Sequence, residues 1–233
     1  MYKDKKILAL VPARGGSKGI KDKNIIPLQG APLISYTINS ALGSKYIDNT
    51  VVTTDSERIA SVAMLYGASV PFMRPAELAS DSAKTIDSVI HAVDTLAEKG
   101  ECYDVLVLLQ PTQPLRTSED IDNAIHLFFE NNRQSLVSVT PVENHPLLIR
   151  SINSDGELVS LLDSGSTCRR QDMDKYYSVN GCIYINNIEE LSGDTSFNDN
   201  KIPYIMDKDR AVDIDDLNDL FLAEYYLQRK DMK

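Results

Sequence analysis

The sequence contains no apolar run long enough to cross a lipid bilayer. Its longest apolar stretches, such as residues 7–11 and 105–109, are far shorter than the roughly 20 residues that a transmembrane helix needs. The first residues are polar and lead directly into a strand-like run, without an apolar region followed by a small-residue cleavage site. We therefore expect a cytoplasmic protein that does not enter a membrane.

Basic residues are in deficit. The 233 residues include 24 Lys and Arg against 34 Asp and Glu, which gives a formal net charge of -10 at pH 7. Proteins that bind nucleic acid broadly need a basic face that neutralises phosphates. The composition therefore argues against nucleic acid as a partner.

Cysteine and histidine are also scarce. The three cysteines are widely spaced and lack the C-x-x-C pairing of a zinc or redox site, so we interpret them as packing thiols: Cys102, Cys168 and Cys182. His91 and His126 fall within predicted helices, and His145 precedes a proline. No histidine therefore stands out as a general base.

Strand-like and helix-like segments alternate along a chain that is 42% hydrophobic, enough for a sizeable core. The predicted strands are residues 6–12, 50–54, 104–110, 135–140, 181–186 and 203–206. The predicted helices are residues 33–42, 56–66, 85–99, 118–131 and 217–228. Ser56 and Ser118 stand where a helix cap is expected, and Gly67 and Gly100 follow helix ends. This α/β pattern predicts a mostly parallel central sheet covered by helices on both faces, in a single domain over residues 1–233.

The segment at residues 142–177 interrupts this alternation. It follows Pro141, contains Pro146 and Gly156, and has two short strand-like pieces, at residues 147–152 and 157–161. The pattern predicts a small inserted hairpin, and a projecting hairpin is a candidate dimer contact.

A basic, glycine-rich loop follows the first predicted strand. Residues 14–24 carry four basic side chains and one acidic side chain, and the loop holds Gly15, Gly16 and Gly19. Glycines let backbone N–H groups approach an anion closely, and ligands of open α/β sheets bind beyond the carboxyl ends of strands. The spacing matches neither G-x-x-x-x-G-K-[ST] nor G-x-G-x-x-G. The loop predicts a phosphate site, with a solvated charged turn as the alternative.

Four segments together resemble the CMP-sugar synthetases, especially the acylneuraminate cytidylyltransferases. The first is the loop itself, which reads A-R-G-G-S-K-G and then K-N; the others are R-P-A-E-L-A-S-D at 74–81, L-Q-P-T-Q-P-L-R at 109–116, and R-Q-D at 170–172 leading to N-G-C-I-Y at 180–184. The resemblance implies a Rossmann-like nucleotidyltransferase fold, a three-layer sandwich. It also implies a homodimer that joins CTP to a nine-carbon, sialic-acid-like sugar acid, with release of pyrophosphate and formation of a CMP-sugar.

The resemblance assigns roles to individual residues. The side chains implied to hold the CTP phosphates are Arg14, Ser17, Lys18, Lys23 and Asn24, of which the cations also offset charge on the leaving pyrophosphate. Those implied to lie near the nucleotide are Arg74, Asp81 and Thr85. Those implied to contact the sugar acid are Gln110, Arg170, Asn180 and Tyr184, with Arg170 on its carboxylate. A solvated arginine and a core tyrosine are the alternatives for Arg170 and Tyr184.

Two aspartates precede the last predicted helix. In an extended segment, Asp213 and Asp215 point to the same side and can share a hard cation with phosphate oxygens. The resemblance assigns metal binding and catalysis to this pair, and Mg²⁺ is the expected ion. The alternative is that Asp215 only caps the helix.

Several interpretations of the function and of the substrate stay open. A cytidylyltransferase for the eight-carbon 3-deoxy-octulosonate shares the fold and the reaction, and a nucleotide-binding regulatory module without turnover is a different class. Sialic-acid enzymes of the family commonly have Ser or Thr where Gln113 stands, and of the two aromatics that some use against the N-acyl group only Phe197 is present. Legionaminic- and pseudaminic-type acids are therefore further candidates.

Overall fold

A single six-stranded sheet organises the protein. The computed structural model describes residues 1–17, 19–162 and 173–231, with side chains through residue 229. The strand order is β10-β6-β9-β5-β1-β4, with bounds Ile202–Ile205, Leu136–Pro141, Tyr177–Asn187, Val105–Leu108, Ile7–Pro12 and Asn49–Thr53. Strand β9 runs antiparallel to both of its neighbours, and the other three pairings are parallel. The predicted mostly parallel sheet is confirmed.

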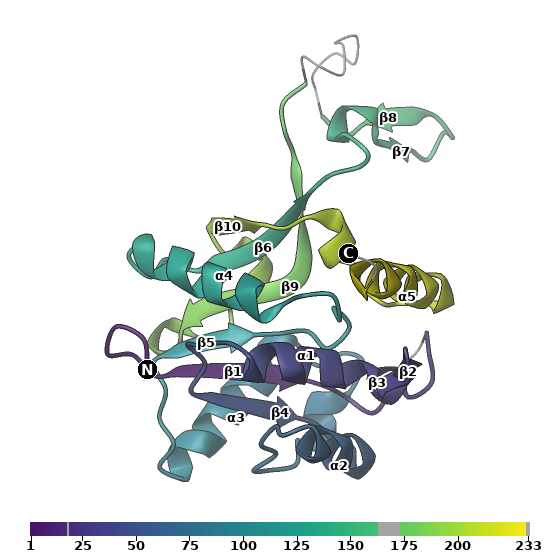
Figure 1. Ribbon diagram of the computed structural model, residues 1–233. Helices are drawn as coiled ribbons and strands as arrows, with labels where there is room; N and C mark the ends of the chain where they lie inside the picture. The colour runs from purple at the N-terminus through teal and green to yellow at the C-terminus, as the bar shows by residue number, and fades with distance from the viewer. Residues whose placement is uncertain (18, 163–172, 232–233) are drawn as a thin grey trace.

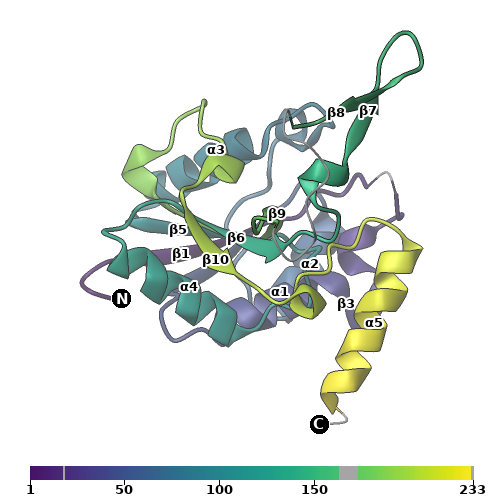
Figure 2. The same cartoon turned by 90° about the horizontal axis from the view of Figure 1, so that it is seen from above.

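Helices cover both faces of this sheet (Figures 1 and 2). Helices α1 (Leu33–Leu42), α2 (Glu57–Leu65) and α4 (Ser118–Glu130) lie on one face, and α3 (Thr85–Glu98) lies on the other. Successive residues of β1 alternate between the two buried clusters, because strand side chains alternate in direction and both faces are covered. The three-layer sandwich is confirmed.

A third apolar cluster joins the last helix to the region that follows the glycine-rich loop. Helix α5 (Leu217–Asp231) packs Leu220 and Ala223 near the small hairpin of β2 (Pro27–Leu28) and β3 (Ala31–Pro32). The 3-10 helices within the described residues are η1 Lys23–Ile25, η2 Ala76–Ala79, η3 Pro146–Leu148, η5 Ile188–Glu190, η6 Phe197–Asp199 and η7 Lys208–Arg210. Within the described ranges no helix is both long and apolar enough to cross a membrane.

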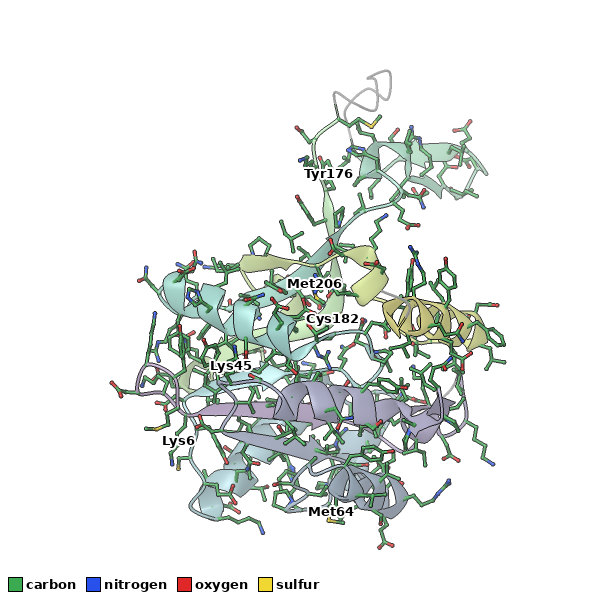
Figure 3. The ribbon with its side chains drawn as sticks, in the orientation of Figure 1. Lys6, Lys45, Met64, Tyr176, Cys182 and Met206 are labelled. Carbon is green, nitrogen blue, oxygen red and sulfur yellow. The ribbon has the colours of Figure 1, made fainter. Side chains whose placement is uncertain are left out.

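The predicted inserted hairpin is present. Strands β7 (Arg150–Ile152) and β8 (Leu158–Ser160) pair with each other in a separate sheet, and Figures 1 and 2 show them projecting from the body. Strand β9, however, begins at Tyr177, earlier than the predicted residue 181. Its first residues pair with β6 beyond the body of the sheet, on the arm that carries Tyr176 (Figure 3).

Two local predictions need correction. The cap of α4 is Thr117, whose Oγ1 accepts a hydrogen bond from Asp120 N at 3.2 Å, and not Ser118. Of the predicted packing thiols, Cys182 is buried in the body (Figure 3), whereas Cys102 is exposed. Cys168 lies outside the described residues. The predicted cap of α2 is confirmed, since Ser56 Oγ accepts from Ile59 N.

Candidate active site

A cleft of about 590 Å³ opens beyond the carboxyl ends of β1 and β5. It lies between the glycine-rich loop, the segment that leads into α3, and the acidic segment before α5. Most of the residues singled out from the sequence line it together: Arg14, Ser17, Lys23, Asn24, Arg74, Asp81, Thr85, Gln110, Asp213 and Asp215. Parallel strands end at the same sheet edge, which is why segments so distant in the chain meet here.

The glycine-rich loop is held at its base by two hydrogen bonds. Gly15 N donates to Asp55 Oδ1 at 2.8 Å, and the buried Asn24 donates from Nδ2 to Arg14 O at 2.9 Å. A Cβ at Gly19 would overlap Asp215 O, so the loop packs directly on the backbone of the acidic segment. Glycine at position 19 is therefore required for the loop to close that side of the cleft.

Two cations of the cleft pair with carboxylates. Arg14 Nη1 lies 2.8 Å from Asp81 Oδ1, and Lys23 Nζ lies 2.9 Å from Asp215 Oδ1. These pairs are partly open to solvent, so each is worth little for stability and an anionic ligand can displace the carboxylate.

Arg74 differs from these cations because it is buried. It donates from Nη2 to Thr53 O at 2.6 Å and from Nε to Thr53 Oγ1 at 3.2 Å. Burial lowers the pKa of its guanidinium, and the Asp55 carboxylate partly opposes that shift. Arg74 is therefore a fixed positive wall of the cleft.

Asp213 and Asp215 place two carboxylates close enough to affect each other's charge. Desolvation raises the pKa of Asp213 above its ordinary value; a hydrogen bond from Thr112 opposes the rise, and the Asp215 carboxylate adds to it. The backbone ties the two segments together, because Ile214 N donates to Thr112 O at 2.9 Å. A cation placed between these carboxylates would relieve their repulsion.

Helix α5 is capped by Asp216, not by Asp215. Asp216 Oδ1 accepts from Asn218 N at 2.7 Å and from Asp219 N at 3.1 Å. Asp219 Oδ2 accepts in turn from Asp216 N, which completes a reciprocal cap. The Asp215 side chain instead faces the cleft, so the capping alternative for Asp215 is wrong.

A second cavity of about 440 Å³ adjoins the first, and Lys84, Thr85 and Gln110 line both. Its wall includes Tyr184 and Phe197, whose ring centroids are 5.8 Å apart. Tyr184 is a core residue as well, only 5% exposed, and burial raises the pKa of its hydroxyl to about 12.

Not every residue singled out from the sequence reaches these cavities. Asn180 lines neither, because its Oδ1 accepts from Ser138 Oγ at 2.6 Å and from Cys182 N at 3.0 Å inside the sheet. Lys18 and Arg170 lie outside the described residues. None of the three histidines lines either cavity.

Lys84 is a lining residue that the sequence reasoning missed. It directly precedes α3, and its side chain makes no ion pair or hydrogen bond with any residue in the described ranges. The available signal was its position, between the R-P-A-E-L-A-S-D segment and a predicted helix that begins at residue 85. Three other lining residues, Ser80, Ser88 and Thr112, were also not singled out from the sequence.

Fold and cleft together define an α/β protein with a polar cleft, lined by cations and carboxylates, at the carboxyl edge of its sheet. The sequence model of the family described as cytidylyltransferase matches residues 8–232. The chain therefore belongs to the cytidylyltransferase family, and it is a nucleotidyltransferase.

Relatives with known names support this placement. The chain is 37% identical over 228 residues to a CMP-N,N'-diacetyllegionaminic acid synthase of Legionella pneumophila, covering 96% of this chain and 97% of that protein. It is 36% identical over 229 residues to the post-translational flagellin modification protein B of Campylobacter coli, covering 97% of each. It is also 37% identical over 227 residues to an N-acylneuraminate cytidylyltransferase of Escherichia coli, covering 97% of this chain and 53% of that protein.

A solved structure shows the same fold at low sequence identity. The CMP:2-keto-3-deoxy-manno-octonic acid synthetase in complex with CTP aligns with a TM-score of 0.73 at 15% identity, covering 97% of this chain and 99% of that one.

Proposed function

We propose that the protein couples CTP to a nine-carbon 2-keto-3-deoxy sugar acid of the sialic acid type, yielding a CMP-sugar and pyrophosphate. The observation that carries the proposal is the cleft itself, where a basic loop and two aspartates adjoin a second cavity with a partly aromatic wall. Relatives of 36 to 37% identity, two of them named for making CMP-sugars of this type, support the substrate class.

The triphosphate would bind along the glycine-rich loop. Arg14 and Lys23 would exchange their carboxylate partners for phosphate oxygens, which bear more charge and accept several hydrogen bonds. Ser17, Asn24, Arg74 and Thr85 line the same cleft and would orient the nucleotide. The same cations would offset the charge that develops on the departing pyrophosphate.

Asp213 and Asp215 would hold Mg²⁺. Among the described residues, no cluster of three or more His, Cys, Asp or Glu side chains is arranged to bind a metal. Two carboxylates still fit this ion, since Mg²⁺ keeps several waters and takes further oxygens from substrate phosphates. When bound, the ion supplies charge neutralisation and Lewis-acid polarisation at the α-phosphate.

The reaction needs no covalent intermediate. The anomeric hydroxyl of the acceptor forms a bond to the α-phosphorus while the bond to the β-phosphate oxygen breaks on the opposite side. We assign the hydroxyl proton to a water at Asp215, whose side chain is 78% exposed and therefore open to solvent. Gln110 and Thr85, at the junction of the two cavities, would hold the acceptor against the phosphate.

Pyrophosphate release from CTP and Mg²⁺ with a panel of 2-keto sugar acids tests this function. We expect release with one or more nine-carbon acids of neuraminic, legionaminic or pseudaminic type. A preference above about tenfold, roughly 1.4 kcal/mol, identifies the substrate. Release only with 3-deoxy-octulosonate would favour the eight-carbon alternative, and no release from folded protein would favour a regulatory module.

We also propose that the protein is a homodimer joined through the inserted hairpin. The hairpin exposes large apolar side chains: Ile152 and Leu158 are each 71% exposed, and Leu161 is 60% exposed. Such a patch on a two-stranded projection has too little of its own core to remain uncovered in water.

A further inference from the structure

Gln113 holds the part of β9 around Gly181, where the pairing of β9 with β6 is irregular. Its carboxamide is fully buried: Nε2 donates to Asn180 O at 2.6 Å, and Oε1 accepts from Cys182 Sγ at 2.9 Å. The two contacts lie on either side of Gly181 in the chain. Gln113 lines neither cavity, so it cannot select a substrate by touching it.

Gly181 supports the side chain of Gln110. Its φ is +77°, and a Cβ built there would come within 2.7 Å of Gln110 Oε1 and 3.2 Å of Gln110 Cδ. The positive φ favours glycine, and an added Cβ would push the end of the Gln110 side chain aside. The Gln110 carboxamide therefore lies directly against the backbone of residue 181.

The same part of β9 is linked to the main chain of Gln110 by a buried guanidinium. Arg116 donates from Nη1 to Cys182 O at 2.6 Å and from Nη2 to Thr37 Oγ1 at 2.8 Å. Thr37 Oγ1 then donates to Gln110 O, at a long 3.4 Å. The irregular part of β9 around Gly181 is consequently linked, through Arg116 and Thr37, to Gln110, which follows β5.

The Gln110 carboxamide itself is free to bind a ligand. It lines both cavities and makes no hydrogen bond in the part of the chain that the structure describes. An amide offers two donors and an acceptor, whose directions are set by the orientation of its plane.

We propose that Gly181 and Gln113 are positioning residues that fix the plane of the Gln110 carboxamide, and that this orientation sets the affinity for the acceptor sugar acid. The inference rests on the proposed function. It makes Gln113 a residue that affects acceptor choice indirectly, through Gly181 and Gln110, without contacting the acceptor.

Steady-state kinetics and thermal midpoints of single and double variants test this relay. In Gly181→Ala, the added methyl displaces the carboxamide, so we expect the KM for the best sugar acid of the panel to rise at least about tenfold. The KM for CTP should stay within about twofold, because the phosphate contacts are elsewhere. Gln113→Met, which keeps the length of the side chain but loses both hydrogen bonds, should raise the same acceptor KM.

The decisive comparison uses Gln110→Ser as the background. Shortening residue 110 removes the atoms that collide with a Cβ at 181, so Gly181→Ala and Gln113→Met should add less than about a twofold change in acceptor KM there. If each variant keeps its full effect in the Gln110→Ser background, the relay through Gln110 is wrong.

Gly100→Ala is the matched control for strain. Gly100 has φ of +82° at the end of α3, with nothing within 4 Å of an added Cβ. Gly181→Ala should lower the thermal midpoint more than Gly100→Ala does, and Gln110→Ser should remove that excess. Thermal midpoints can be measured whether or not the protein is active. If the wild type shows no activity but the variants show this pattern of midpoints, only the proposed function is contradicted. Normal turnover without coupling contradicts only the relay.

Discussion

Adjacent aspartates before α5 do different work at the scale of single residues. Asp216 accepts two backbone hydrogen bonds at the start of the helix, and these lower the pKa of its carboxyl. Asp215 makes no such contact and pairs with Lys23 across the cleft. Asp216 stabilises the start of α5, whereas the side chain of Asp215 lies in the cleft. Substitutions at the two positions should therefore separate an effect on stability from an effect on activity.

Asp215→Asn should reduce the rate at saturating CTP by at least about a hundredfold, roughly 2.7 kcal/mol, because the amide is a poor ligand for Mg²⁺. The thermal midpoint should change little, since Asp215 does not cap α5. The control, Asp216→Ala, should lower the midpoint and leave the dependence on Mg²⁺ unchanged. Near-normal turnover of Asp215→Asn over a Mg²⁺ titration would remove Asp215 from the metal site.

Lys84 offers a second prediction at this scale. It is a cation without a protein partner in the described ranges, and it lies where the two cavities meet. Lys84→Ala should lower kcat/KM for the acceptor by about tenfold or more, whereas Lys84→Arg should retain part of the activity. Lys99→Ala, at the far end of α3, is the matched control. Equal activity of Lys84→Ala and Lys99→Ala would show that Lys84 takes no part in the reaction.

At the scale of elements, an ion pair between the buried Asp120 and the partly exposed Arg210 anchors the segment that leads to the aspartates. Asp120, 1% exposed on α4, accepts from Arg210 Nη1 at 2.7 Å and from Tyr204 OH at 3.2 Å. Its Oδ2 also completes the cap of α4 with Thr117. One carboxylate thus joins α4, β10 and the turn that precedes Asp213.

Asp120→Ala should lower the free energy of unfolding by about 3 kcal/mol, because it breaks this ion pair and a cap together. Chemical denaturation measures this loss. Glu119→Ala, one residue along the same helix turn but outside this pair, is the control and should cost much less. A loss of similar size in both variants would show that the Asp120 contacts carry no special weight.

The elements that the sequence predicted well are those governed by local patterns. Apolar runs predicted β1 and β5 because both are buried on both faces. The first half of β9 escaped prediction because its residues, from Tyr177, are exposed and pair only with β6. The cap of α4 was misplaced by one residue because Thr117 and Ser118 are both good caps, and only the backbone conformation distinguishes them.

The site was predictable only in part, for a physical reason. Lys23 and Asp215 form a pair across 192 positions of the chain, a separation over which no periodicity carries information. Their convergence followed from the family resemblance and from the rule that parallel strands end at one edge. The position of the half-buried Asn180 side chain, hydrogen-bonded to Ser138, could not be predicted, since it lies at an irregularity in the pairing of β6 with β9.

The whole molecule combines an acidic body with a basic cleft. The net charge is -10, yet the glycine-rich loop gathers cations at one edge of the sheet. If the cleft binds a nucleotide as proposed, these cations should attract it there despite the negative net charge, and salt should weaken that attraction. The hairpin projects from this body (Figure 1), and its large apolar side chains Ile152, Leu158 and Leu161 are exposed.

The last prediction concerns assembly. If the hairpin joins two copies, a charge on its exposed apolar face should prevent association, because burying an unpaired carboxylate in an interface is costly. Leu158→Asp should therefore sediment as a monomer at micromolar concentration where the wild type sediments as a dimer. The thermal midpoint of Leu158→Asp should stay close to that of the wild type, since Leu158 is 71% exposed and outside the core. Leu65→Asp is the matched control, because Leu65 is 82% exposed on α2, away from the hairpin, and should leave the dimer intact. We expect Leu158→Asp to lose activity when the dimer dissociates, because the hairpin of one copy would reach over the acceptor site of the other. A wild type that is monomeric and fully active at the same concentration would refute this assembly.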